Sequence, residues 1–139
     1  AHAAGANLLA GTDVFDTYIF PGFSVHEELV ELVAAGLSPI DALRTATINA
    51  ATFSGVEDEF GSIEEGKAAD MLLLNADPTR DIRSTQKIEG LFFNGQYYER
   101  SALDRLLEYA EQQAGSWRTN LHILWAAVRS PLLRVQLAD

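Results

Sequence analysis

Two stretches in the first half of the chain carry apolar residues at helical spacing, with polar positions between them. The first follows the capping box Ser24–Glu27, whose hydroxyl and carboxylate can satisfy free backbone groups at a helix start, and it stops at Gly36. The second has Pro39 at its first helical position and is predicted as a single helix up to Gly55. Its apolar face is mostly alanine, which predicts close packing against another element.

The same spacing returns near the other end of the chain. A leucine-rich stripe predicts a helix that starts at Ser101 and stops at Gly115. A further helix is predicted from Thr119, ending before Pro131, because the residue before a proline rarely stays helical. These segments form a predicted helical tail.

Shorter apolar runs between the helices are typical of strands. Residues 68–74 form an apolar run too short for a helix and bounded by turn residues on both sides, which predicts a buried strand. Residues 91–98 read as a hairpin around Asn94 and Gly95, the pair that supplies positive φ at both turn positions. Residues 8–10 predict one more strand, which runs into a glycine-containing turn.

The overall composition narrows the classes of function. Of 139 residues, 47% are hydrophobic, which is enough for a buried core. The net charge of −10 has the wrong sign for binding phosphates or anionic lipid, so neither nucleic acid nor a membrane surface is expected as a partner. Without cysteine there is no disulfide framework, thiolate nucleophile or Cys-ligated zinc. Carboxylates and three histidines remain as possible metal ligands.

Asp13 is the first candidate for chemistry, because it follows directly on the predicted strand 8–10. A carboxylate at the carboxyl end of a parallel strand points into the mouth where α/β barrels carry their active sites. Spacing alone favours a plainer interpretation, in which Thr12 and Asp13 form a turn, since Asp is a common turn former.

Seven motifs in a fixed order favour the catalytic interpretation of Asp13 over the turn interpretation. They are Gly11–Asp13, Phe20–Gly22, His26–Leu29, Ala35–Pro39, Ala42–Arg44, Ala46–Ala51 and Gly61–Leu74. Together they closely resemble the C-terminal part of the amidohydrolase superfamily, most of all its imidazolonepropionase-like and prolidase-like branch. The last motif matches the superfamily pattern G-x-I-x-x-G-K-x-A-D-hydrophobic.

The resemblance implies an α/β protein that is a C-terminal fragment of a (β/α)₈ TIM-like barrel, plus part of a composite β-sandwich, with C-terminal helices. Residues 1–58 would be the last strand and helices of the barrel, 59–100 the C-terminal part of the sandwich lobe and 101–139 a helical tail. A complete barrel takes about 250 residues, so the chain is expected to be a segment of a longer protein.

The resemblance also implies a site. Asp13 would bind a divalent metal, expected to be zinc, and would take a proton from the metal-activated water. Thr12 would shape the turn or touch substrate. His26 would contact the substrate or hydrogen-bond to a metal-binding residue. The plainer interpretation is a partly exposed histidine near a helix start. The other ligands of the superfamily pattern, beginning with a His-x-His pair, do not occur in this chain.

The implied activity is hydrolysis of an amide-type C–N bond in a small molecule, such as a cyclic amide, an imidazolone or an Xaa-Pro-like dipeptide. With at most one metal ligand, the isolated chain is expected to be inactive. The alternative is a non-catalytic assembly subunit or truncated product that pairs with another chain. Either way, the cut edge of a barrel predicts a homo-oligomer or completion by the missing N-terminal part.

Two further groups of residues have structural interpretations. The acidic pairs Glu27–Glu28 and Glu64–Glu65 are predicted to lie on solvated faces and turns. The aromatic residues of the hairpin 91–98 are predicted to pack across the strands rather than hold a ligand.

Overall fold

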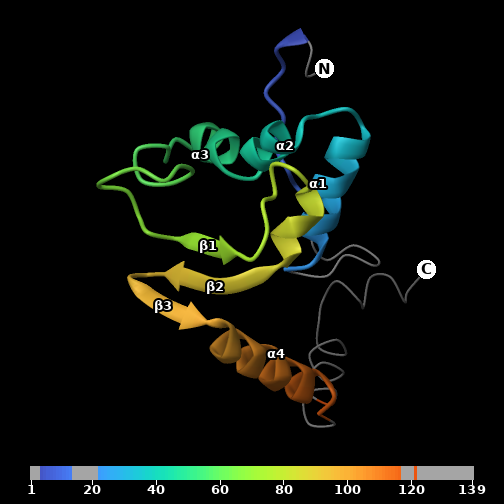
Figure 1. Cartoon of the computed structure of the whole chain (residues 1–139), viewed down its shortest axis with the longest axis vertical. Helices are drawn as coiled ribbons and strands as arrows, with labels where there is room; N and C mark the ends of the chain where they lie inside the picture. The colour runs from blue at the N-terminus through green and yellow to red at the C-terminus, as the bar shows by residue number, and fades with distance from the viewer. Residues whose placement is uncertain (1–3, 14–21, 117–120, 122–139) are drawn as a thin grey trace, which may run out of the picture. The chain divides into compact units, whose positions relative to one another are not determined.

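The computed structural model describes residues 4–13, 22–116 and 121. The elements in chain order are α1 (Ser24–Ala34), α2 (Pro39–Thr45), α3 (Ile48–Ser54), β1 (Met71–Leu74), the 3₁₀ helix η2 (Ile82–Gln86), β2 (Ile88–Phe93), β3 (Gln96–Glu99) and α4 (Arg100–Ala114). Figure 1 shows these helices and the three-stranded sheet, which confirm the α/β class. The helix predicted after Thr119 falls almost wholly outside the described residues.

The chain divides into two compact units, residues 1–100 and residues 101–139. The described part of the second unit is essentially the helix α4, as its leucine stripe predicts, and Leu106 and Leu107 on that stripe are exposed. No described helix is both long enough and apolar enough to cross a bilayer.

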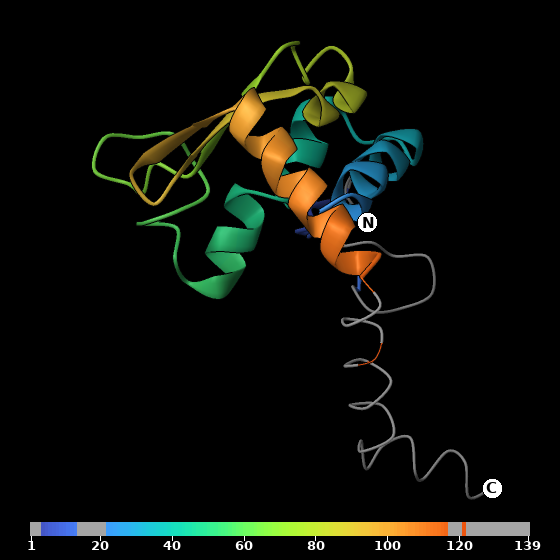
Figure 2. The same cartoon turned by 90° about the horizontal axis from the view of Figure 1, so that it is seen from below.

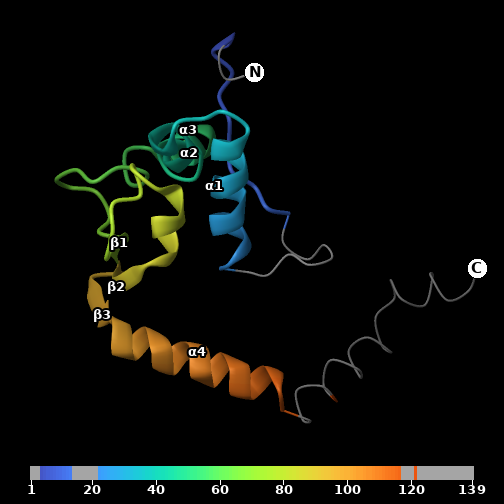
Figure 3. The same ribbon diagram turned by 45° about the vertical axis from the view of Figure 1, so that its right-hand side comes forward.

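The core of the first unit lies where α1, α2 and η2 meet. Leu29 of α1, Ala42 of α2 and Ile82 of η2 are at most 5% exposed, and they pack together with Leu37. Figure 3 shows η2 alongside α1, and this pairing ties the helical half of the unit to the segment that leads into β2. Ala42 is completely buried, so its small side chain allows α2 to approach its neighbours closely, as the alanine in the predicted apolar face suggests.

The prediction of one continuous helix from Pro39 to Gly55 is wrong, because the helix breaks after Thr45. The hydroxyl of Thr47 donates to the carbonyl of Leu43, a local bond that competes with regular helix geometry. In a continuous helix the Thr45 carbonyl would accept from the N–H of Asn49. Here it accepts from another segment instead, and Figure 2 shows α2 and α3 running in different directions.

That other segment is residues 8–10, for which the predicted strand is also wrong. The N–H of Ala10 donates to the Thr45 carbonyl at 3.2 Å, and the Leu8 carbonyl accepts from Nδ2 of Asn49 at 3.1 Å. A strand needs neighbouring strands to accept its backbone bonds. Among the described residues, the Ala10 N–H and the Leu8 carbonyl bond to Thr45 and Asn49 at the break between α2 and α3 instead. The segment therefore stays irregular.

The sheet has the order β1-β2-β3 with both pairs antiparallel. The predicted strand over 68–74 forms only from Met71 onward, and its predicted burial is wrong among the described residues, because Leu72 and Leu73 are exposed. The hairpin prediction is confirmed, since Asn94 (φ 50°) and Gly95 (φ 74°) both adopt the positive φ that a two-residue turn requires. The rings of Phe92 and Tyr97 lie 4.8 Å apart across the strands, which confirms the packing interpretation for this pair. β1 is the strand nearest to α2 and α3 in Figures 1 and 3.

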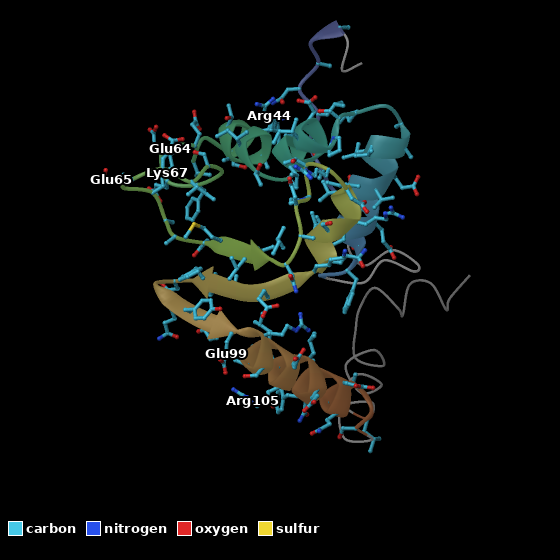
Figure 4. The ribbon with its side chains drawn as sticks, viewed as in Figure 1. Arg44, Glu64, Glu65, Lys67, Glu99 and Arg105 are labelled. Carbon is cyan, nitrogen blue, oxygen red and sulfur yellow. The ribbon has the colours of Figure 1, made fainter. Side chains whose placement is uncertain are left out.

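The loop between α3 and β1 explains the glycine-lysine motif structurally. Gly61 has φ 94°, and a Cβ atom there would lie 2.7 Å from Cβ of Ala51 in α3. Lys67 donates from Nζ to the Glu57 carbonyl at 2.6 Å and to the Ser62 hydroxyl at 2.7 Å. Figure 4 shows Lys67 beside Glu64, which forms an ion pair with it at 3.3 Å. The motif therefore folds this loop back on itself and against α3.

Candidate functional site

Asp13 lies at the end of the segment 8–13, which is bonded to the break between α2 and α3. The residue is exposed, and its backbone is in the left-handed region at φ 50°. Asp is one of the few residues with a side chain that tolerates this conformation, which occurs mostly in turns and loops. Residues 11–13 themselves are irregular, and residues 14–21 lie outside the described part of the chain. An irregular segment can still present a carboxylate outward from an anchored backbone. The left-handed backbone of Asp13 is compatible with both the turn interpretation and the catalytic one, which stay predictions.

Three hydrogen bonds anchor the backbone that leads to Asp13. Two of them hold Leu8 and Ala10 to the break between α2 and α3, as described above. The third joins the N–H of Gly11 to Oε1 of Glu28 in α1, at 2.8 Å. The segment is therefore fixed from two sides, by the helix pair α2–α3 and by α1, and the last anchor lies two residues before Asp13.

Glu28 is the residue that the sequence interpretation missed. The predicted solvated face is correct for its neighbour Glu27, which is exposed, but Glu28 is half-buried and bonded to a residue 17 positions away. Its second oxygen, Oε2, is buried and makes no hydrogen bond within the described part of the chain. One signal was present: Glu28 precedes Leu32 by one helical turn, which puts it beside the half-buried side of α1.

His26 lies on α1 and connects it to η2. Its Nδ1 atom is 3.0 Å from Oγ1 of Thr85, which comes 59 residues later in the chain. The Thr85 hydroxyl donates its one proton to the Ile82 carbonyl at 2.9 Å, so it accepts from the Nδ1–H group of His26. Burial lowers the pKa of His26, which favours the neutral ring. Its bond is to η2 rather than to the Asp13 turn.

Thr12, the third candidate, is half-buried beside Asp13. The structure brings Thr12 and Asp13 together on one turn, as their adjacency requires, and places His26 and Glu28 on the neighbouring helix α1.

A metal centre cannot be assembled from the described residues alone. Within residues 4–13, 22–116 and 121, no three His, Asp or Glu side chains gather closely enough to hold an ion. His2 and His122 lie outside the described residues. Asp13 offers one carboxylate, and zinc sites normally need three or four protein ligands. The part of the chain that the structure describes therefore does not fit a complete metal site.

An apolar groove of about 710 Å³ lies between the α2–α3 pair, the loop that follows α3, and β1. Its lining includes Leu43, Ala50, Phe60 and Met71. Ile63, also in the lining, is 84% exposed. Large apolar side chains left this open to water usually mark a contact surface.

The family model described as "Amidohydrolase family" matches residues 1–97, which is more than half of the chain. The chain therefore belongs to the amidohydrolase family, and the resemblance drawn from the motifs is confirmed. Members of this family generally use a divalent metal.

Individual relatives match over limited lengths. Adenine deaminase 1 from Jannaschia sp. (strain CCS1) is 44% identical over 89 residues, covering 64% of this chain and 14% of the relative. Imidazolonepropionase from Symbiobacterium thermophilum is 55% identical over 40 residues, covering 29% of this chain and 9% of the relative. The chain thus spans less than a sixth of the length of either protein.

Solved structures give the same picture. A prolidase-like protein from Bifidobacterium longum superimposes with a TM-score of 0.66 at 38% identity, covering 79% of this chain and 28% of that protein. Phenylurea hydrolase B superimposes with a TM-score of 0.55 at 40% identity, covering 58% of this chain and 18% of that protein. The local fold is therefore shared with a part of larger proteins.

Proposed function

We propose that this chain is the C-terminal part of a metal-dependent hydrolase that cleaves an amide-type C–N bond in a small molecule. The observation that carries the proposal is the anchored segment 8–13 that presents the exposed residue Asp13 at its end. Membership of the amidohydrolase family supports the reaction class. Relatives named adenine deaminase, imidazolonepropionase and prolidase-like protein agree in acting on C–N bonds.

Asp13 would act as the proton carrier of the reaction. Its carboxylate would accept a proton from the attacking water as the new C–O bond forms. It would then give that proton to the nitrogen as the C–N bond breaks, so that the carboxylate is regenerated. The divalent metal that the family generally uses would supply Lewis-acid activation, with its remaining ligands on other parts of the complete protein.

Thr12 and His26 are proposed to assist this carboxylate. Half-buried Thr12 directly precedes Asp13, where it can shape the turn or meet the substrate. His26 uses Nδ1 for Thr85, so Nε2 is the nitrogen that would meet substrate or a neighbouring ligand. A neutral ring favours this use, because its Nε2 atom is then a hydrogen-bond acceptor.

The proposed division of the chain follows the family scheme. Residues 1–58 would complete a (β/α)₈ barrel, residues 59–100 would belong to a composite β-sandwich, and residues 101–139 would form a helical tail. In a complete barrel, residues 8–10 would find strands on both sides and take the extended pairing that they lack here.

We further propose that the rest of the complete protein covers the apolar groove beside β1. Two observations support this occupant: the chain spans 28% of the prolidase-like protein, and β1 pairs only with β2 among the described strands. The groove also favours the second candidate function, a non-catalytic subunit completed by another chain or a second copy. Sedimentation of the complete protein distinguishes the two candidates. A monomer supports a groove covered by the same chain, whereas an obligate complex supports an assembly subunit covered by another chain.

The activity is tested with the complete protein that contains this chain, loaded with zinc. The substrate panel is a set of cyclic amides, an imidazolone, adenine and Xaa-Pro dipeptides, with Asp13→Ala as the inactive reference. Release of the amine or opening of the ring by wild type, lost in Asp13→Ala, supports the proposal. A zinc-loaded, folded protein that hydrolyses none of these compounds counts against it.

A further inference from the structure

We propose that Glu28 is a positioning residue that holds the backbone at Asp13 in its working geometry. The inference rests on the proposed role of Asp13 and adds a residue to the same site. It starts from one contact, the 2.8 Å hydrogen bond from the Gly11 N–H to Oε1 of Glu28.

The acceptor of this bond stands on a helix that packs into the core. A carboxylate oxygen is a good acceptor for a backbone N–H. Glu28 is half-buried on α1, and its neighbour Leu29 is 4% exposed in the core. The helix therefore provides a fixed point, from which Glu28 reaches a segment 17 residues away.

The irregular segment at Asp13 has no helix or strand hydrogen bonds of its own to fix it. Asp13 holds a left-handed conformation that Asp tolerates better than most residues, and contacts of the neighbouring backbone help to select it. Thr45 and Asn49 fix the segment up to Ala10, but from one side only. Glu28 fixes Gly11 from the other side. Among the described residues, Gly11 is the anchored position nearest to Asp13 in sequence.

The two oxygens of Glu28 have different environments, which sets the choice of variant. Oε1 accepts from Gly11, whereas Oε2 is buried without a hydrogen bond among the described residues. Glu28→Gln keeps an acceptor oxygen for Gly11 and places an NH₂ group where Oε2 lies. Glu28→Ala removes the acceptor altogether. Glu27→Ala is the matched control, since Glu27 is an exposed acid on the same helix.

The experiment measures steady-state kinetics of the complete, metal-loaded protein on its best substrate. We expect Glu28→Ala to lower kcat by about 10- to 100-fold with KM changed by less than about threefold, since a small misplacement of a catalytic group acts on turnover. Glu28→Gln recovers most of kcat, and Glu27→Ala matches wild type. Hydrogen exchange of the segment 8–13 should become faster in Glu28→Ala alone.

The proposal is overturned if Glu28→Ala keeps the kcat of Glu27→Ala, or if exchange in the segment 8–13 does not change. Should Glu28→Ala fail to fold, the Gln variant decides: kcat near wild type supports the acceptor role, and kcat reduced about 100-fold in a folded protein contradicts it. An Asp13→Asn variant distinguishes failure of the proposed function from failure of the positioning role. Full activity of Asp13→Asn refutes the proposed function. Loss of activity in Asp13→Asn together with full activity of Glu28→Ala refutes only the positioning role of Glu28.

Discussion

The ring of His26 and the hydroxyl of Thr85 meet at 3.0 Å across 59 residues of sequence. The bond joins α1 to η2, two of the elements that share the core around Leu29 and Ile82. Because the Thr85 hydroxyl already donates to Ile82, the Nδ1–H group of His26 is the donor, in the neutral as well as in the charged ring. Protonation therefore leaves this bond in place and is opposed by burial instead.

This arrangement predicts a stability that depends on pH. Burial lowers the pKa of His26 in the folded protein below its ordinary value of 6.5. The unfolded chain then binds the proton more readily, so the free energy of unfolding should fall as pH drops below about 6.5. His26→Asn keeps an N–H donor near the position of Nδ1 but does not titrate.

Urea unfolding of wild type and His26→Asn at pH 7.5 and pH 5.5 measures this effect. The wild type should lose more stability than the variant over that interval. The carboxyl groups of Asp77 and Asp81, with pKa values lowered mainly by Thr79 and Arg83, act at lower pH and are common to both proteins. Equal losses in the two proteins would show that burial of His26 has no effect on its titration.

A second prediction compares two glycines of the same motif. Gly61 (φ 94°) and Gly66 (φ 92°) share a positive φ, but only Gly61 faces atoms of α3 where a Cβ would lie. Gly66→Ala should cost about 1 kcal/mol of stability for the strained backbone. Gly61→Ala should cost more, about 2–4 kcal/mol, because Ala51 and Ile48 must also move. Thermal unfolding of both variants checks this, and equal costs would refute the packing role of Gly61.

Lys67 is predicted to stabilise the loop by hydrogen bonding rather than by charge alone. Its side chain is only 14% exposed and donates to Glu57 and Ser62. Lys67→Met keeps the aliphatic stem and removes these donors, so it should cost about 1–3 kcal/mol in chemical unfolding. Exposed Lys87 provides the control, and Lys87→Met should change stability by less than about 0.5 kcal/mol. Similar costs for the two variants would contradict the prediction.

The 139-residue chain by itself should bind zinc no better than an ordinary acidic surface. The described residues contain no cluster of three possible ligands, and Asp13 supplies a single carboxylate. Isothermal titration calorimetry of the chain with zinc should therefore show only weak, non-stoichiometric heats. Stoichiometric, submicromolar binding that disappears in Asp13→Ala would show that the chain carries a site of its own.

Local features were predictable where neighbouring residues determine them. The Asn94–Gly95 hairpin follows from backbone chemistry, and α1 and α4 follow from apolar spacing with turn residues after them. The predicted capping box Ser24–Glu27 is wrong, because the N-cap of α1 is Phe23, which has no side-chain oxygen to accept from the helix start. The start of the helix itself shifts by one position only. Helix ends fray, so a difference of this size is ordinary.

Features that depend on distant partners were not predictable. The break after Thr45 exists together with the bond from Ala10, and Glu28 turns inward because Gly11 lies within reach of it. Nothing in the local pattern separates Glu28 from exposed Glu27 except its spacing from Leu32. Family motifs found Asp13, whereas the anchor beside it became visible only in the folded chain.

The central claim is that Asp13 carries the proton in hydrolysis, and Asp13→Asn in the complete protein tests it most directly. The amide keeps the shape and an oxygen that can reach a metal, but it cannot accept a proton from water. Turnover of the best substrate should fall by about 100-fold or more while metal content falls modestly. Asp58→Asn, an exposed site in the acidic stretch after α3, should behave as wild type. Near-normal turnover of Asp13→Asn would show that Asp13 is only a turn residue and would contradict the account.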